Sequence, residues 1–210
     1  MNLLIIGASR GIGHQLVIQS LGAGHHVTAY ARHPERIVAR HDRLRKVAGN
    51  VLDAVAVADA MRAQDAVVCT LGKKTPWEAP ADLFSRGTQN VLDAMHSCGV
   101  RRLVCVTGIG AGESRGHGGF VYDRLLRGLV LRQLYDDKDR QEALVRECDA
   151  DWTIVRPGFL TNGAMTGEYR ALTDLDGVTA GQISRADVAH FILQELATGR
   201  FLRRAPLLTY

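Results

Sequence analysis

The sequence contains no long run of apolar residues, and none approaches the roughly 18 residues that a helix needs to cross a bilayer. The apolar start runs directly into a glycine-rich turn, without a charged leader or a cleavage site, so we expect no signal peptide. We therefore predict a cytoplasmic protein without a membrane partner.

Residue clusters that bind metals or form disulfides are also missing. The four cysteines show no CxxC spacing, and three of them lie in or beside apolar patterns, which is typical of reduced packing residues. No group of His, Cys or carboxylate residues has metal-ligand spacing, so we predict no metal site.

The positive charge is not gathered into a patch. The net charge is +4 and the pI is near 9.0, yet the basic residues are scattered and no compact basic and aromatic patch occurs. We expect no nucleic-acid partner, and part of this charge is available to hold an anionic cofactor. The length of 210 residues, 46% of them apolar, fits one globular domain, which we expect to be a monomer or a weak homodimer.

What the sequence does contain is a glycine-rich turn near its start. The apolar run 3–6 predicts a strand buried on both faces, and the spacing of Ile12, Leu16 and Val17 predicts a helix packed against it. The N–H groups and the positive end of that helix face the turn, where a pyrophosphate is the usual ligand. The glycines permit a sharp turn and a close ligand, so we predict a dinucleotide-binding turn made by Gly7, Ser9, Arg10, Gly11, Ile12 and Gly13.

Strand patterns alternate with helical patterns along the rest of the chain. The strands are expected at 26–30, 44–47, 66–69, 102–107 and 152–155, and the helices at 54–61, 80–98, about 121–148 and from about 184. This alternation predicts an α/β fold with three layers, a doubly wound parallel sheet of the Rossmann type, in a single domain spanning 1–210. Loops near 72–80, 108–120 and 158–182 are expected to form a small substrate cleft at the carboxyl edge of the sheet.

The end of the second strand pattern indicates which dinucleotide binds. Arg32 stands where a Rossmann fold usually has the acid that holds the ribose hydroxyls of NAD. A guanidinium binds phosphate bidentately and stacks on adenine, so Arg32, helped by Arg10, favours NADP. The alternative is a solvated arginine at a strand end.

Two further loops are expected to contact the cofactor. Asn50 and Val51 would flank the adenine, although Asn50 is also an ordinary turn former. Leu71 and Gly72 would pass close to the ribose and the diphosphate.

Taken together, these motifs resemble a known family. The spacing G-x-x-x-G-x-G with Ser9 and Arg10 inside it resembles the short-chain dehydrogenase/reductase superfamily, and nearly the whole chain is similar to its atypical members, particularly the flavin reductase and biliverdin-IX beta reductase family. The supporting motifs are Arg32 and the segments 7–13, 49–52, 64–68, 87–90, 156–158, 166–169 and 183–187. The resemblance implies a single-domain reductase that takes hydride from NADPH, with the nicotinamide beside Thr107, Lys138, Pro157, Gly158 and Phe159.

The sequence departs from this family at the general acid. Short-chain dehydrogenases place a tyrosine four residues before a lysine, which lowers the phenol pKa. Here Tyr122 is followed at that spacing by Leu126, and Tyr135 by Asp139, while Lys138 lies one position short.

A second general acid known from this family is also missing. Relatives that reduce biliverdin carry a histidine where this chain has Gly158. The acid of either scheme is therefore absent.

We predict an NADPH-dependent oxidoreductase that transfers hydride to a small planar acceptor, such as a flavin or a quinone, without the Tyr-Lys pair. Lys138 and Thr107 are the candidate catalytic residues: Lys138 would bind the nicotinamide ribose and Thr107 would hydrogen-bond near the reacting ring. A solvated helix lysine and a strand-end threonine are the alternatives. His117 is the best candidate for a displaced acid, although a lone loop histidine usually lies on the surface. The aromatic residues that either stack on the acceptor or pack in the core are Trp77, Phe120, Phe159 and Tyr169.

Other functions fit the same cofactor turn. A catalytically inactive protein that senses NADP(H) and regulates a partner is the alternative, and the missing Tyr-Lys pair favours it. A nucleotide-sugar epimerase is disfavoured because both the Tyr-Lys pair and the extra C-terminal substrate region of that relative are absent.

Overall fold

Strand β1 (Asn2–Ile6) lies inside the main sheet and buries side chains on both of its faces. The computed structural model describes residues 1–73, 80–118 and 132–210. Leu3 and Ile5 join one core cluster, whereas Leu4 and Ile6 join the other, because successive side chains of a strand point to opposite faces. The predicted strand buried on both faces is therefore confirmed.

Eight strands form the main sheet, in the order β3-β2-β1-β4-β5-β6-β10-β8. Every pairing in it is parallel except that of β8 with β10, and a separate parallel pair joins β7 to β9. The bounds are β2 (His26–Ala31), β3 (Leu44–Ala48), β4 (Ala66–Cys69), β5 (Arg102–Val106), β6 (Asp151–Pro157), β7 (Phe159–Thr161), β8 (Arg170–Leu172), β9 (Gln182–Ser184) and β10 (Leu207–Thr209).

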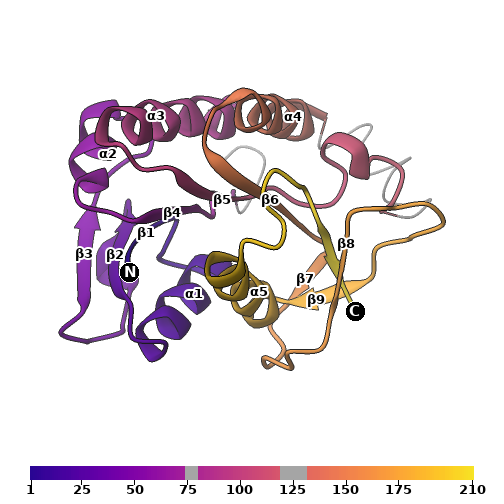
Figure 1. Cartoon of the computed structure of the whole chain (residues 1–210), viewed down its shortest axis with the longest axis horizontal. Helices are drawn as coiled ribbons and strands as arrows, with labels where there is room; N and C mark the ends of the chain where they lie inside the picture. The colour runs from indigo at the N-terminus through magenta and orange to yellow at the C-terminus, as the bar shows by residue number, and fades with distance from the viewer. Residues whose placement is uncertain (74–79, 119–131) are drawn as a thin grey trace.

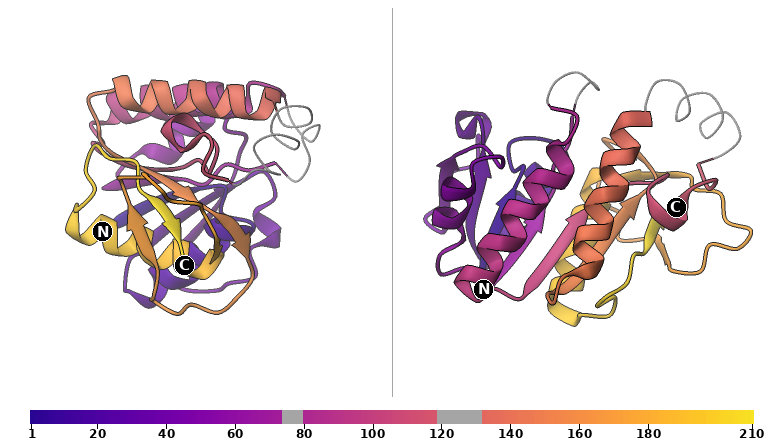
Figure 2. Two further views of the ribbon diagram at one scale, coloured as in Figure 1. Left: turned by 90° about the vertical axis from the view of Figure 1, so that its right-hand side faces the viewer. Right: turned by 90° about the horizontal axis from the view of Figure 1, so that it is seen from above.

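Helices cover the sheet on both sides (Figures 1 and 2). Helices α1 (Gly11–Gly22) and α5 (Arg185–Thr198) pack side by side on one face. The other face carries α2 (Ala54–Met61), α3 (Leu83–Cys98) and α4 (Arg132–Glu147), and two short 3-10 helices are η1 (Pro34–Arg36) and η2 (Gly112–Ser114). The predicted three-layer, doubly wound α/β architecture is confirmed. None of the helices among the described residues is both long and apolar enough to cross a membrane.

The C-terminal strands differ from the sequence prediction. Strands β7 to β10 have three residues each, too few to show a periodic pattern, and they were not expected. Among the described strands, the sheet departs from parallel pairing only at one edge, where β8 runs antiparallel to β10. An edge strand of this kind needs no crossover helix to reach its neighbour.

The described starts of α3 and α4 differ from the predicted ones. Helix α3 begins at Leu83, three residues after the predicted start. The helical pattern predicted from about 121 is described only from residue 132, and Phe120 and Tyr122 lie outside the described residues, as does Trp77.

Helix α1 approaches the sheet closely at Gly13. A Cβ on Gly13 would collide with the main-chain oxygen of Gly7 and would lie 2.6 Å from Oγ1 of Thr70. Gly13 and Gly7 meet through their main chains, and main-chain atoms cannot move aside as a flexible side chain can. The expected tight seating of the helix on the strand is confirmed at this residue.

We expect Gly13→Ala to lower the free energy of unfolding by about 1–3 kcal/mol, because the methyl group forces α1 away from β1 and β4. Gly22→Ala, in the same helix but with no heavy atom within 4 Å of an added Cβ, is the control and should be neutral or slightly stabilising. Urea unfolding of both variants measures the difference, and equal stabilities would contradict this packing role.

Asp187, in the first turn of α5, ties three C-terminal segments together. Its carboxylate accepts hydrogen bonds from the Tyr210 hydroxyl (2.6 Å), the Ser184 hydroxyl (3.0 Å) and the main-chain N–H groups of Thr166 and Gly167 (both 2.8 Å). Burial alone raises the pKa of this carboxyl, but the hydrogen bonds outweigh burial and lower it to about 2.

We expect Asp187→Asn to lower the free energy of unfolding by about 1–3 kcal/mol at neutral pH. A carboxyl with a folded-state pKa near 2 and an ordinary value of 3.8 stabilises the fold above pH 4 and loses that contribution as the pH falls toward 2. The difference in free energy of unfolding between wild type and variant, measured by urea unfolding, should therefore decrease as the pH falls from 4 toward 2. The exposed Asp176→Asn is the control, and a difference that does not change with pH would show that ionised Asp187 is not the cause.

Candidate functional site

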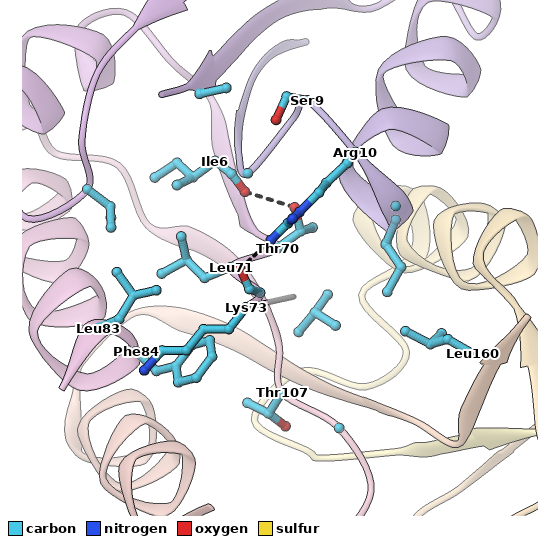
Figure 3. A pocket seen from close by; sticks show the side chains of 18 of the residues that line it. Ile6, Ser9, Arg10, Thr70, Leu71, Lys73, Leu83, Phe84, Thr107 and Leu160 are labelled. Carbon is cyan, nitrogen blue, oxygen red and sulfur yellow. Dashed lines mark hydrogen bonds between the residues drawn. The ribbon is translucent and has the colours of Figure 1, made fainter. Parts of the chain in front are cut away.

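A cleft of about 1130 Å³ runs along the carboxyl ends of the parallel strands. Segments that follow β1, β2, β3, β4, β5 and β6 all line it, as expected for a ligand site in a doubly wound sheet. Its volume exceeds the roughly 300–1,000 Å³ of an ordinary small-molecule pocket, so an extended ligand such as a dinucleotide fits. Figure 3 shows part of the lining.

The glycine turn forms the middle of the cleft. Gly7 and Gly11 have φ values of +89° and +59°, which favour glycine. A Cβ on Gly7 would lie 2.6 Å from the main-chain oxygen of Thr70, so the turn tolerates no side chain there. The side chain of Arg10, the N-cap residue of α1, makes no capping hydrogen bond to the N–H groups of the first turn.

Arg10 connects the turn with the loop after β4. Its Nη2 donates to the carbonyl oxygen of Gly72 at 3.1 Å (Figure 3). The structure thereby brings together the residues predicted for the diphosphate region, and all except Gly13 line the cleft: Gly7, Ser9, Arg10, Gly11, Ile12, Leu71 and Gly72.

One end of the cleft is strongly basic. Arg32 lines it as predicted, and His33 and Arg36, which sequence reasoning did not single out, lie beside it. His33 precedes the 3-10 helix η1 and Arg36 ends it, so the available signal was the presence of two further basic residues within four positions of Arg32. His33 also contacts Glu35 at 3.2 Å, with both side chains largely exposed.

The loop with Asn50 and Val51 forms the neighbouring wall. The Tyr30 hydroxyl donates to the main-chain oxygen of Asn50 at 3.0 Å, and burial, reinforced by Asp53, raises the pKa of Tyr30 to about 12, so this donor stays protonated. The Asn50 side chain accepts from the main-chain N–H of Leu52 at 3.1 Å, which is the turn-forming role considered above. Asn50 nevertheless lines the cleft, so the two roles are compatible.

The other end of the cleft holds Thr107 and Lys138. Lys138 Nζ donates to the main-chain oxygen of Thr107 at 2.5 Å and lies 4.4 Å from the ring centre of Phe84. Burial lowers the pKa of this lysine. The structure thus joins the two predicted catalytic residues, through the Thr107 main chain.

The Thr107 hydroxyl is directed toward a buried carboxylate. It donates to Oε1 of Glu142 at 2.7 Å, and Glu142 in turn accepts from Nε and Nη2 of Arg156 at 3.0 and 2.5 Å. A hydroxyl has one proton, so Thr107 can offer only lone pairs to a ligand in the cleft. Sequence reasoning missed Glu142, although it lies four residues after Lys138 and therefore on the same helix face.

Pro157, Gly158 and Phe159 line the same end. A Cβ on Gly158 would collide with the main-chain oxygen of Gly181, so a histidine does not fit at this position without a backbone shift. Phe159 is 37% exposed and Leu160 is 36% exposed, which leaves an apolar wall open to a ligand.

Several candidates do not reach the cleft. His117 is absent from its lining, and its Nδ1 lies 2.7 Å from the carbonyl oxygen of Val178. Tyr169 packs against Phe191 and hydrogen-bonds His190 at 2.8 Å. Neither supports the expected acid or stacking role. Tyr135, in contrast, lines the cleft together with Lys138.

The four cysteines form no disulfide in the part of the chain that the structure describes. Cys69, Cys98, Cys105 and Cys148 are free, and Cys69 and Cys105 are buried neighbours on β4 and β5. Residues 1–73, 80–118 and 132–210 contain no group of three His, Cys, Asp or Glu side chains arranged to hold a metal ion.

The chain is similar in sequence and in structure to several known proteins. The chain is 30% identical to UPF0659 protein YMR090W of Saccharomyces cerevisiae, covering 93% of this chain and 87% of the relative. It is 26% identical to the uncharacterized sugar epimerase YhfK of Bacillus subtilis, covering 93% and 88%. Among solved structures, the anaerobillin reductase ChuY of Escherichia coli O157:H7 is similar, with a TM-score of 0.83, 25% identity and coverage of 100% and 97%.

A family model described as NAD(P)H-binding matches residues 7–198, which include the glycine turn, the basic end of the cleft and the Thr107–Lys138 end. The chain belongs to this NAD(P)H-binding family.

Proposed function

We propose that this protein is an NADPH-dependent reductase that transfers hydride to a small planar acceptor, such as a flavin or a quinone. The observation that carries the proposal is the charge and shape of one continuous cleft. It is basic at the end near Arg32 and apolar at the end near Phe159, and the uncapped start of α1 lies between them.

The lining supports a cofactor with several negative charges. Among the described residues that line the cleft, there are six lysines and arginines and no aspartate or glutamate: Arg10, Arg32, Arg36, Lys73, Lys138 and Arg185. Arg32 and Arg36 would hold a 2′-phosphate, which an acid at this end would repel. This supports NADP over NAD.

The residues at the other end fit a nicotinamide and an acceptor. The chemistry that the cofactor supplies when bound is hydride donation. The protein would orient the two reactants. Lys138 and the main chain of 157–159 would hold the nicotinamide end of the cofactor, and Phe159 and Leu160 would exclude water from one face of the acceptor.

Thr107 and Gly158 offer no proton to a ligand at this end of the cleft, although the phenol of Tyr135 and Lys138 also line it. The Thr107 proton is given to Glu142, Gly158 replaces the histidine of the biliverdin-reducing relatives, and Lys138 donates to a carbonyl. An acceptor that needs no proton delivered in step, with water supplying it later, suits this site. The similarity to ChuY, an anaerobillin reductase, supports a reductase. The name of YhfK points to an epimerase, which the missing Tyr-Lys pair disfavours.

We expect Arg32→Asp to weaken NADPH binding by about 10- to 100-fold while NADH affinity changes less than about threefold, because only NADPH carries the 2′-phosphate. Fluorescence titration of the two cofactors measures both constants. Arg62→Asp makes the same charge change at an exposed site outside the cleft and should affect neither. Equal weakening of NADPH and NADH would overturn the NADP assignment.

Turnover is tested by following oxidation of NADPH and NADH with a panel of flavins, quinones and biliverdin, with the protein-free rate subtracted. We expect saturable NADPH oxidation with at least one planar acceptor. If NADPH binds and no acceptor in the panel is reduced, the reductase proposal fails for these acceptors, and the NADP(H)-sensing protein becomes the better description.

A further inference from the structure

Arg185, the first residue of α5, brings a positive charge to the start of α1. Helices α1 and α5 lie side by side (Figure 1), and both begin at the edge of the sheet where the cleft lies. A Cβ on Gly11 would lie 3.7 Å from Nε of Arg185 and 3.8 Å from its Cδ. The guanidinium therefore faces the glycine turn, and Arg185 lines the cleft.

The side chain of Arg185 is held in place from one side. Its Nη1 donates to the carbonyl oxygen of Thr161 at 3.0 Å, to Oδ1 of Asn162 at 2.8 Å and, more weakly, to the carbonyl oxygen of Leu160 at 3.4 Å. Among the described residues no hydrogen bond uses Nε or Nη2, and no carboxylate forms an ion pair with Arg185. One edge of the guanidinium is thus anchored, and its charge is not neutralised by the described part of the chain.

This arrangement is electrostatically unfavourable without an anion. The start of a helix carries a partial positive charge, and α1 has no acidic residue in its first turn and no side-chain cap. Arg185 beside it adds a full positive charge. A diphosphate between α1 and Arg185 would accept hydrogen bonds from both and remove the repulsion.

We infer that Arg185 binds the diphosphate of the cofactor through Nε and Nη2. The inference rests on the proposed function, which supplies the ligand, but it assigns a binding residue from α5, outside the glycine turn. Since Nη1 of the same guanidinium holds Thr161 and Asn162, Arg185 also fixes the end of β7 against the bound cofactor. The end of β7 continues from Phe159 and Leu160, the apolar wall of the acceptor end.

The test measures binding of three ligands by calorimetry: NADPH, NADH and ADP-ribose, which has the diphosphate but neither the 2′-phosphate nor the nicotinamide. We expect Arg185→Gln to weaken all three by the same factor, at least about tenfold, because each loses the same charged hydrogen bonds. Arg62 is an exposed arginine outside the cleft, so Arg62→Gln is the matched control and should leave the affinity for all three ligands unchanged.

The results separate this inference from the proposed function. If the wild type binds none of the three ligands, the proposed cofactor is wrong. If the wild type binds them and Arg185→Gln retains its affinity for ADP-ribose, only the role of Arg185 is wrong. A loss confined to NADPH would place Arg185 at the 2′-phosphate instead and would also overturn the inference.

Arg185→Lys guards against loss of the fold in the glutamine variant. It keeps the positive charge but cannot hold the Nη1 acceptors and two phosphate oxygens at once. We expect ADP-ribose binding to be at least about threefold weaker than in the wild type. Wild-type affinity in this variant would overturn the proposed paired contact.

Discussion

The site depends on the close contact between the glycine turn, the start of α1 and Thr70. Gly13 packs on the main chain of Gly7, and Oγ1 of Thr70 donates to the carbonyl oxygen of Ile6 at 2.8 Å (Figure 3). With side chains at either glycine, α1 would lie farther from β1 and β4. The close contact places the uncapped end of the helix directly at the carboxyl edge of the sheet, where its N–H groups can meet an anion.

Buried ionic pairs stabilise the geometry of the opposite end. Arg156 is 1% exposed and pairs with Glu142, which also accepts the Thr107 hydroxyl, so β5, β6 and α4 are joined through one carboxylate. Such pairs contribute little net stability, because desolvation offsets the attraction, but they leave few alternative arrangements. The orientation of Thr107, and with it the main-chain oxygen that accepts from Lys138, follows from this network.

The distribution of charge matters more than its total. A net charge of +4 is modest for 210 residues, yet the described lining of the cleft holds six basic side chains and no acid. Arginines far apart in the sequence account for this concentration: Arg10 and Arg32 follow successive strands, and Arg185 comes from the last helix. A low-dielectric cleft lined in this way attracts an anionic ligand and repels cationic ones.

The sequence by itself determined the fold class, the glycine turn and most of the residues that line the cleft, because these depend on local periodicity and on chain order in a parallel sheet. The run 3–6, the glycines and Arg32 needed no knowledge of distant contacts. Only the tertiary structure decided what the buried polar groups do. Glu142 meets Thr107 across 35 residues and Arg185 meets Gly11 across most of the chain, and such pairings leave no periodic pattern. The three-residue strands β7 to β10 are likewise fixed by their partners, since segments this short have no intrinsic preference strong enough to be recognised.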